Sequence, residues 1–320
     1  MQIQIEVDLP EWKVVDFHCH FPLKSNHWVE PYKDRYVREF GIEKWEYLQM
    51  ISESFNRKWR KAWCFPDPEK PNNNFKVLAE RWANEVEKNN VEKVVFVTSG
   101  GNDKAIKLIK LYPTKFIAFA HHSPDEEKAA EKLEVAIKAG LKGYKIMAPI
   151  VETPLNDKKL YPIWEVASTY ELPIMIHFGI LGGGGGVGYG ENINPLIIHN
   201  VAKAFPKIKI VIPHFGCGYV RELLQLMWAC ANIYVDTSGN NEWMRWMPYE
   251  LNLNILFRKF YETVGPERII FGSDSEWFPR GYVIRYFLDQ LKAAREVGIP
   301  EKHIKMIFRE NALNLLKLEG

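Results

Sequence analysis

The stretch Lys13-Val14-Val15-Asp16-Phe17-His18-Cys19-His20 leads from a short apolar run into two histidines near the start of the chain. Side chains alternate along a strand, so strict alternation places His18 and His20 on one face and Phe17 on the other. Two imidazoles on one face at a strand end can bind a divalent metal together. The pattern His-x-His is weak by itself, because nine histidines in 320 residues produce close pairs by chance.

Other apolar runs end in the same way. Three of them lead to a residue that can bind a metal: run 174–176 to His177, run 210–213 to His214, and run 269–273 to Asp274. A further run carries Lys145 within it. Ligands that recur at strand ends are hard to explain as core packing, since core positions favour apolar side chains.

Short apolar runs alternate with segments of helical period along the whole chain. The runs cover residues 13–17, 93–98, 116–120, 141–146, 173–178, 208–213, 232–236 and 268–273. Segment 125–139 shows the helical period, with apolar residues three or four positions apart. Strands that alternate with helices imply parallel βαβ units. Eight units in about 250 residues or more predict an α/β fold, the (β/α)8 TIM barrel, with the active site at the C-terminal ends of the strands.

The regular alternation favours one barrel domain over residues 1–320. A doubly wound open sheet is the main alternative, but no Gly-x-Gly-x-x-Gly opens a helix after the first strand. Segment 21–71 is too long for a plain loop and predicts a helical, lid-like insertion after strand 1. The glycine-rich segment 179–190 is either a flexible tether or a mobile loop that closes over the site or offers backbone N–H groups to an anion. Segment 305–318 predicts a helix packed on the barrel.

Composition narrows the class of partner and the compartment. Lys plus Arg number 42 against 40 Asp plus Glu, and no basic block stands out, so nucleic acid is not the expected partner. No apolar stretch approaches the roughly 18–20 residues of a membrane span, and no signal peptide is apparent. The four cysteines are scattered without Cys-x-x-Cys spacing, which favours a reduced, cytoplasmic protein. We expect a homo-oligomer acting on a small molecule.

Several motifs together resemble the amidohydrolase superfamily, in the branch that includes aminocarboxymuconate-semialdehyde decarboxylase. They are Asp16-x-His18-x-His20, Gly143-Tyr144-Lys145, Ile176-His177, Pro213-His214-Phe215-Gly216, Val235-Asp236-Thr237-Ser238, Phe271-Gly272-Ser273-Asp274 and Glu310-Asn311-Ala312-x-x-Leu315-Leu316. Each motif alone is weak, and their order and spacing together are specific. The resemblance covers nearly the whole chain except the insertion.

The resemblance implies a set of metal ligands and catalytic groups. It implies that one metal is held by four residues: His18, His20, His177 and Asp274. His214 would act as an acid/base or bind a second metal. Lys145 stands where members with two metals carry a carboxylated lysine that bridges them. A hydrogen-bonded ammonium is the alternative state of Lys145, and one or two ions per chain are therefore expected.

The residue types themselves favour certain chemistry. Imidazoles with a carboxylate suit Zn²⁺, Mn²⁺ or Fe²⁺, with Zn or Mn the expected ion, better than Mg²⁺ or Ca²⁺. A metal-activated water would supply hydroxide near neutral pH. Asp274 can serve as ligand and accept the nucleophile's proton, while His214 can position a carbonyl or protonate the leaving group. Asp16 is expected to support the histidines from behind.

These features predict a metal-dependent hydrolase of a small amide, ester or lactone. A metal-dependent non-oxidative decarboxylase of an aromatic or muconate-like acid is the alternative, and a metal-binding barrel without catalysis is a third. Arg57 and Arg60 in the insertion are candidates for binding a substrate carboxylate, because a guanidinium fork matches that group. His121 and His122 follow the third strand and either face substrate or cap a loop.

Overall fold

The computed structural model describes residues 8–23, 26–70, 72, 74–180 and 191–318. Parallel strands alternate with helices along this part of the chain, as the sequence predicts. The strands are β1 Val14–His20, β2 Val91–Thr98, β3 Phe116–Ala118, β4 Tyr144–Met147, β5 Pro173–His177, β6 Lys209–Ile212, β7 Ile233–Asp236 and β8 Ile269–Ile270. The α-helices are α1 Asn26–Phe40, α2 Ile42–Ala62, α3 Phe75–Lys88, α4 Asn102–Leu111, α5 Ala129–Lys138, α6 Tyr161–Tyr170, α7 His199–Ala204, α8 Val220–Ala229, α9 Leu253–Val264, α10 Ile284–Glu296, α11 Glu301–Lys305 and α12 Asn311–Leu315.

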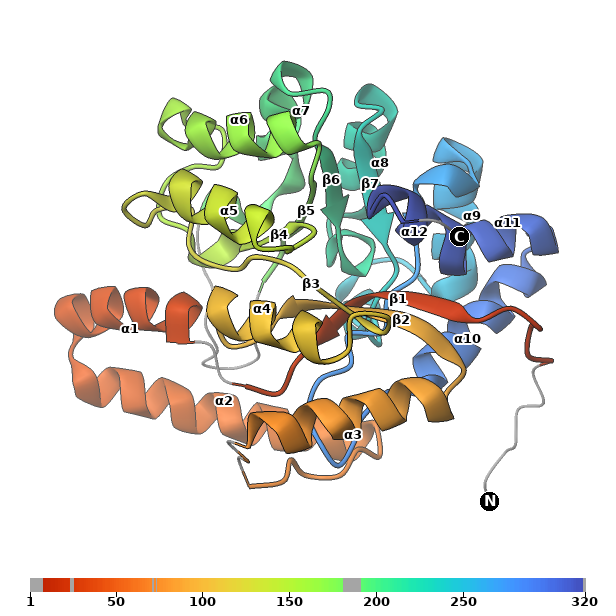
Figure 1. The fold of residues 1–320 in the computed structure, drawn as a ribbon, viewed down its shortest axis with the longest axis horizontal. Coiled ribbons are helices and arrows are strands. Elements are labelled where there is room, and N and C mark those ends of the chain that lie inside the picture. The colour runs from red at the N-terminus through yellow and green to blue at the C-terminus, as the bar shows by residue number, and fades with distance from the viewer. Residues whose placement is uncertain (1–7, 24–25, 71, 73, 181–190, 319–320) are drawn as a thin grey trace.

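The strands close into a barrel. Strands β1 to β3 form one parallel ladder and β4 to β8 another, each in sequence order. Backbone hydrogen bonds join the ladders at both junctions. Ala120 N–H donates to Gly143 O (2.8 Å) between β3 and β4, and Asp274 N–H donates to His18 O (2.8 Å) between β8 and β1. The (β/α)8 barrel is therefore confirmed over the open sheet, and Figure 1 shows the helices placed around the strands.

An inner apolar cluster fills the barrel. Most strands contribute to it, and α12 closes its lower end: Val15, Phe17, Val95, Val97, Ile117, Phe119, Met175, Val211, Ile270, Ala312, Leu313, Leu315 and Leu316. Phe17 and Phe119 meet edge to face across this interior, with ring centroids 5.6 Å apart. Fully burying one such side chain stabilises the fold by about 1.5–3 kcal/mol. Because apolar side chains fill the barrel interior, polar side chains that converge between the strands are expected at the C-terminal mouth.

Strict alternation fails in β1, where it predicted Phe17 on the face opposite His18. The pairing of β1 with β2 shifts register between Asp16 and Cys19, so the strand carries an irregularity there. As a result Phe17 points into the inner cluster and His18, its neighbour, also reaches the barrel mouth. A bulge re-aims side chains in this way, and bulges are common beside active sites.

Two predicted helices have different bounds in the structure. Helix α5 begins at Ala129, four residues later than predicted, because Lys128 adopts a left-handed backbone with φ 58°. Asp125, expected in its first turn, instead accepts the backbone N–H of Glu152 at 2.8 Å. Segment 305–318 is not one α-helix, since a π-helical stretch over Met306–Glu310 separates α11 from α12.

The insertion after strand 1 is helical, as predicted. Helices α1 and α2 form a long pair at one side of the barrel (Figure 1). Trp45 of α2 is buried and packs near the rings of Tyr32 and Tyr36. Of the glycine-rich segment, residues 181–190 lie outside the described part of the structure. No helix in the described part is long and apolar enough to cross a bilayer.

Candidate metal centre

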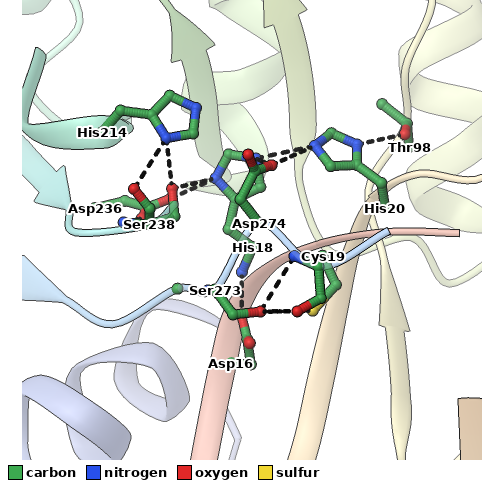
Figure 2. Close-up of polar contacts among 12 residues, drawn as sticks. Asp16, His18, Cys19, His20, Thr98, His214, Asp236, Ser238, Ser273 and Asp274 are labelled. Carbon is green, nitrogen blue, oxygen red and sulfur yellow. Dashed lines mark hydrogen bonds and ion pairs between the residues drawn. The ribbon is translucent and has the colours of Figure 1, made fainter. Parts of the chain in front are cut away.

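Imidazole and carboxylate side chains from separate strands converge at the C-terminal mouth of the barrel. His18 and His20 come from β1 and His177 ends β5. His214 follows β6, and Asp274 follows β8. Figure 2 shows His18, His20, His214 and Asp274 directed toward one another. Residues up to 256 positions apart in sequence meet here because parallel strands place their C-terminal ends at one mouth.

The spacing of three donor atoms suits one metal ion. His18 Nε2 lies 3.3 Å from His20 Nε2, and Asp274 Oδ1 lies 3.1 Å from His20 Nε2 and 3.7 Å from His18 Nε2. Ligand atoms about 2.1 Å from one ion stand about 3.0 Å apart at octahedral angles and about 3.4 Å apart at tetrahedral angles. The observed distances fall around these values, so the three residues fit a common divalent ion.

Two further histidines border this trio. Donor atoms of His214, His18 and Asp274 all lie within 4.8 Å of one another, close enough for His214 to join the ion. The His177 ring lies 5.1 Å from that of His214, centroid to centroid. The Nε2 of His177 is buried and has no hydrogen-bond partner among the described residues. A buried nitrogen left unpaired costs free energy, so His177 is well suited to receive a ligand.

Hydrogen bonds from behind fix the orientation of the two β1 histidines. His18 Nδ1 lies 2.6 Å from Asp236 Oδ2, so this nitrogen carries the proton and Nε2 presents its lone pair to the centre. His20 Nδ1 lies 2.7 Å from Thr98 Oγ1, at the end of β2. With Nδ1 donating to Thr98, His20 likewise presents Nε2. Both imidazoles are thus oriented for binding a metal.

Ser238 links His18 to His214. Its Oγ lies 3.0 Å from Nδ1 of each ring, and Figure 2 shows both contacts. The carbonyl oxygen of Ser238 lies 3.1 Å from His214 Nδ1 and can only accept, so Nδ1 of His214 carries a proton. Its Nε2 is then free to bind a metal, to accept a proton, or, in the imidazolium form, to donate one.

Burial and neighbouring charges set the protonation of the ligands. Burial, with the charge of Lys145, holds the pKa of His18 well below its usual value. Burial and His214 do the same to the pKa of His177. Burial alone would raise the pKa of Asp274, but the hydrogen bond with His20 and the nearby imidazoles hold it well below the usual value. Neutral imidazoles beside an ionised carboxylate are the forms that bind metal.

Lys145 and Asp236 are buried beside these ligands. Burial raises the pKa of Asp236 to about 6, although His214 and Ser238 oppose the rise. Burial lowers the pKa of Lys145 to about 8, against the attraction of Asp236 and Asp274. Among the described residues, none forms a hydrogen bond or a close ion pair with Lys145 Nζ.

Close backbone packing holds this centre together. A Cβ added at Gly272 would lie 2.7 Å from the Cβ of His18 and 2.9 Å from Asp236 Oδ1, so only glycine fits there. Asp16 Oδ1 accepts the backbone N–H groups of His18 (2.9 Å) and Ser273 (3.1 Å), which joins β1 to the β8 loop. Asp16 therefore supports the histidines through the backbone rather than through their rings.

The structure gives partners outside the centre to the four residues predicted to bind substrate. His121 Nε2 accepts the backbone N–H groups of Ser99 (3.1 Å) and Gly101 (2.8 Å). His122 Nε2 lies 2.9 Å from the carbonyl oxygen of Ala129. Both contacts are those of loop-capping histidines, the alternative that the sequence left open.

Arg57 and Arg60 each form ion pairs with acidic residues in the insertion. Arg60 binds Asp67 (2.8 Å) and Glu53 (3.1 Å), and Arg57 lies 3.9 Å from the same Glu53. The Arg57 side chain is 64% exposed. Neither arginine has a polar contact with the metal ligands among the described residues, and a role in substrate binding stays a prediction for both.

Sequence reasoning assigned no role to Thr98, Asp236 or Ser238, although two of them lie in the quoted motifs. The sequence does mark two of them as polar residues at the ends of apolar runs, since Thr98 ends β2 and Asp236 ends β7. They are polar residues at strand ends, as the metal ligands are. The rule that found the ligands would have found these supporting residues as well.

A closed α/β barrel with imidazoles and a carboxylate converging at its C-terminal mouth defines a class, the barrels built to hold a divalent metal. The sequence profile of the amidohydrolase family matches residues 15–318, so the chain belongs to that family. The protein is thus an enzyme of the amidohydrolase superfamily, and the resemblance drawn from its motifs is confirmed. No curated protein matches the chain in sequence.

Solved structures similar to this one share its fold. The 5-carboxyvanillate decarboxylase of Sphingomonas paucimobilis is 15% identical, with a TM-score of 0.62 over 97% of this chain and 100% of that one. The 2,6-dihydroxybenzoate decarboxylase from Rhizobium is 14% identical, with a TM-score of 0.60 over 97% and 100%. The 5-carboxyvanillate decarboxylase of Novosphingobium aromaticivorans, complexed with manganese and 4-hydroxy-3-methoxy-5-nitrobenzoic acid, is 16% identical, with a TM-score of 0.63 over 96% and 97%.

Proposed function

We propose that this protein is a metal-dependent, non-oxidative decarboxylase of an aromatic or muconate-like acid. The observation that carries the proposal is the likeness, over nearly the full chain, to barrels named as decarboxylases of aromatic acids. The sequence favours hydrolysis first and decarboxylation second. The three similar structures described above support the reverse order, because each of them is named as a decarboxylase.

We assign the ion to His18, His20, His177 and Asp274, with His214 beside it. Manganese is our first choice, because a similar barrel is complexed with it, and zinc is the second. Nitrogen and carboxylate donors suit both ions. When bound, the ion supplies a Lewis acid that draws a substrate carboxylate to the mouth of the barrel.

In this proposal the chain's own residues orient the acid and manage one proton. The bond between the ring or chain carbon and the carboxylate breaks, carbon dioxide leaves, and the electron pair stays on the carbon. A proton must then reach that carbon. We assign its delivery to Nε2 of His214, because Ser238 holds the opposite nitrogen and the low pKa of Asp274 keeps that carboxylate ionised.

The direct test measures carbon dioxide release by the manganese-loaded enzyme from a panel of aromatic and unsaturated acids. Vanillate-type acids, dihydroxybenzoates and muconate form the panel, and the chelator-treated enzyme is the control. Release that depends on both substrate and metal supports the proposal. A panel without release, measured on enzyme with a full metal site, speaks against it.

Hydrolysis of a small amide, ester or lactone is the second candidate. It is favoured by the buried, unbonded amine of Lys145, whose pKa of about 8 leaves part of it neutral near physiological pH. A neutral amine combines with carbon dioxide to form a carbamate, and a carbamate could bridge two ions. Mass spectrometry under native conditions would show an added carbon dioxide on Lys145 and two metals per chain. An unmodified Lys145 with a single ion excludes this version.

Assembly, compartment and the role of the insertion are further parts of the proposal. The four cysteines are free, which supports a reduced, cytoplasmic setting. Light scattering would test the homo-oligomer expected from the sequence. Trp59 lies 6.0 Å from Trp277 on the loop after β8, ring to ring, so the helical insertion is well placed to act as a lid over the metal centre.

A further inference from the structure

Arg280 is a partly buried cation on the loop that follows β8, and no carboxylate of the described residues forms an ion pair with it. Its Nη2 donates to the backbone carbonyl oxygen of Asp274 at 3.1 Å. Its Nε is buried and has no partner among the described residues. No described carboxylate forms an ion pair with it, since none lies within 4.0 Å. The guanidinium thus has at least one buried donor without a partner among the described residues, and it touches the backbone of Asp274, a candidate metal ligand.

Aromatic rings flank the guanidinium. Its central carbon lies 3.7 Å from the centroid of the Trp277 ring and 5.1 Å from that of Phe65. Phe65 belongs to the segment after α2, so the insertion supplies one of the two rings that flank the guanidinium. Cation–π contacts offset part of the cost of burying a cation, but they leave the N–H groups without acceptors. Burial lowers the pKa of Arg280, and a guanidinium remains charged even so.

Arg81, on helix α3, provides a direct comparison because it stacks on the same loop. It lies over the ring of Phe278, the residue next to Trp277, at 3.8 Å. Unlike Arg280, it makes a bidentate ion pair with Glu69, at 2.7 and 2.9 Å. Two arginines thus stack on adjacent aromatic residues, and the fold supplies a carboxylate to only one of them. Among the described residues, Arg280 therefore stacks on an aromatic ring as Arg81 does, but pairs with no carboxylate.

We propose that Arg280 determines specificity by binding a carboxylate that stays on the substrate, separate from the carboxylate at the metal. The planar fork of N–H groups matches a carboxylate better than it matches a single oxygen. A planar acid lying between the metal ligands and Arg280 would also meet the ring of Trp277. This inference rests on the proposed binding of a carboxylic acid at the metal centre.

The experiment compares two probe acids on the manganese-loaded enzyme by calorimetry. Benzene-1,3-dicarboxylate has a second carboxylate, and benzoate lacks it. Wild type is expected to prefer the dicarboxylate by about 10- to 100-fold, the range for a charged hydrogen-bond pair. Arg280→Gln should abolish the preference. Arg280→Lys, which keeps the charge and loses the fork, should retain only part of it.

Arg81→Gln is the matched control, because it removes a stacked arginine that already has its own carboxylate. It should leave the preference for the dicarboxylate unchanged. Equal affinity for both probes in wild type, or an unchanged preference in Arg280→Gln, overturns the inference. If Arg280→Gln does not fold, as judged by metal content and unfolding temperature, Arg280→Lys decides by the same comparison.

Carbon dioxide release separates this inference from the proposed function. Release from acids with equal efficiency in wild type and Arg280→Gln, whatever their number of carboxylates, leaves decarboxylation standing and removes the role of Arg280. The opposite result is tight dicarboxylate binding that depends on Arg280, with no carbon dioxide released from any acid. The anion site then stands and the decarboxylase proposal fails.

Discussion

Asp236 accepts a 2.6 Å hydrogen bond from Nδ1 of His18, so a carboxylate at the end of β7 orients an imidazole on β1. Strand β8 lies between these two strands in the barrel. The contact is possible because Gly272, just after β8, leaves room where a Cβ would collide with both residues. Residues from three neighbouring strands therefore orient Nε2 of His18 toward the candidate metal.

Asp236→Asn should weaken metal binding by about 10- to 100-fold, the usual effect of losing such a supporting carboxylate. The amide is nearly the same size, but it no longer holds the proton on Nδ1 of His18 with a charged acceptor. Titration of the metal against a competing chelator measures the effect. Asp289→Asn is the control, since Asp289 lies on α10 and its carboxylate pairs with Arg285 at 3.9 Å rather than with a candidate metal ligand. Equal affinities in both variants would contradict the assigned role of Asp236.

His18→Ala or Asp274→Ala should abolish activity and remove most bound metal. Each substitution removes one of the three donor atoms that lie 3.1 to 3.7 Å apart. Elemental analysis after dialysis measures the metal, and His199→Ala at the surface of α7 serves as the control. Full metal occupancy in either variant would refute the assignment of the centre.

His214→Asn tests the proton-delivery role. If His214 delivers the proton, carbon dioxide release should fall by about 10²- to 10⁴-fold while the metal content stays the same. If His214 instead binds a second metal, the variant should lose one ion per chain. Turnover and metal content are measured on the same preparation. No change in either quantity excludes both roles.

The sequence predicts the barrel and most of the candidate metal ligands for one physical reason. Parallel strands bring their C-terminal ends together, so apolar runs that end in His20, His177 and Asp274 define both fold and site. It does not predict that Phe17 and His18 point the same way, because the irregularity in β1 depends on pairing with β2. The local sequence does not predict such register shifts.

Arg280 shows a second limit of sequence reasoning. The sequence directed attention to Arg57 and Arg60, by their place in the insertion. Whether an arginine lacks a counter-ion depends on contacts between distant segments, such as the one that brings Phe65 against Arg280. The identity of an unpaired arginine therefore emerges only from the folded structure.

The last prediction concerns the buried amine of Lys145, whose pKa falls to about 8 from an ordinary 10.5 because burial penalises its charge. Below pH 8 both the folded and the unfolded chain carry this proton, and folding bears the full cost of burying it. Between pH 8 and 10.5 the folded chain releases the proton while the unfolded chain keeps it. The contribution of Lys145 to the free energy of unfolding therefore rises with pH across that window.

Lys145→Met should raise the free energy of unfolding of the metal-free protein at pH 7 by something on the order of 3–4 kcal/mol, since the pKa of Lys145 falls from 10.5 to about 8 and one pKa unit corresponds to about 1.4 kcal/mol. The difference between variant and wild type should shrink as the pH rises from 8 to 10. Urea unfolding at pH 7, 8, 9 and 10 measures it, and taking the difference cancels the groups common to both proteins. Lys142→Met, at an exposed position three residues away, should change little at any pH. A Lys145→Met variant less stable than wild type at pH 7 would show that Asp236 and Asp274 stabilise the ammonium by more than its burial costs.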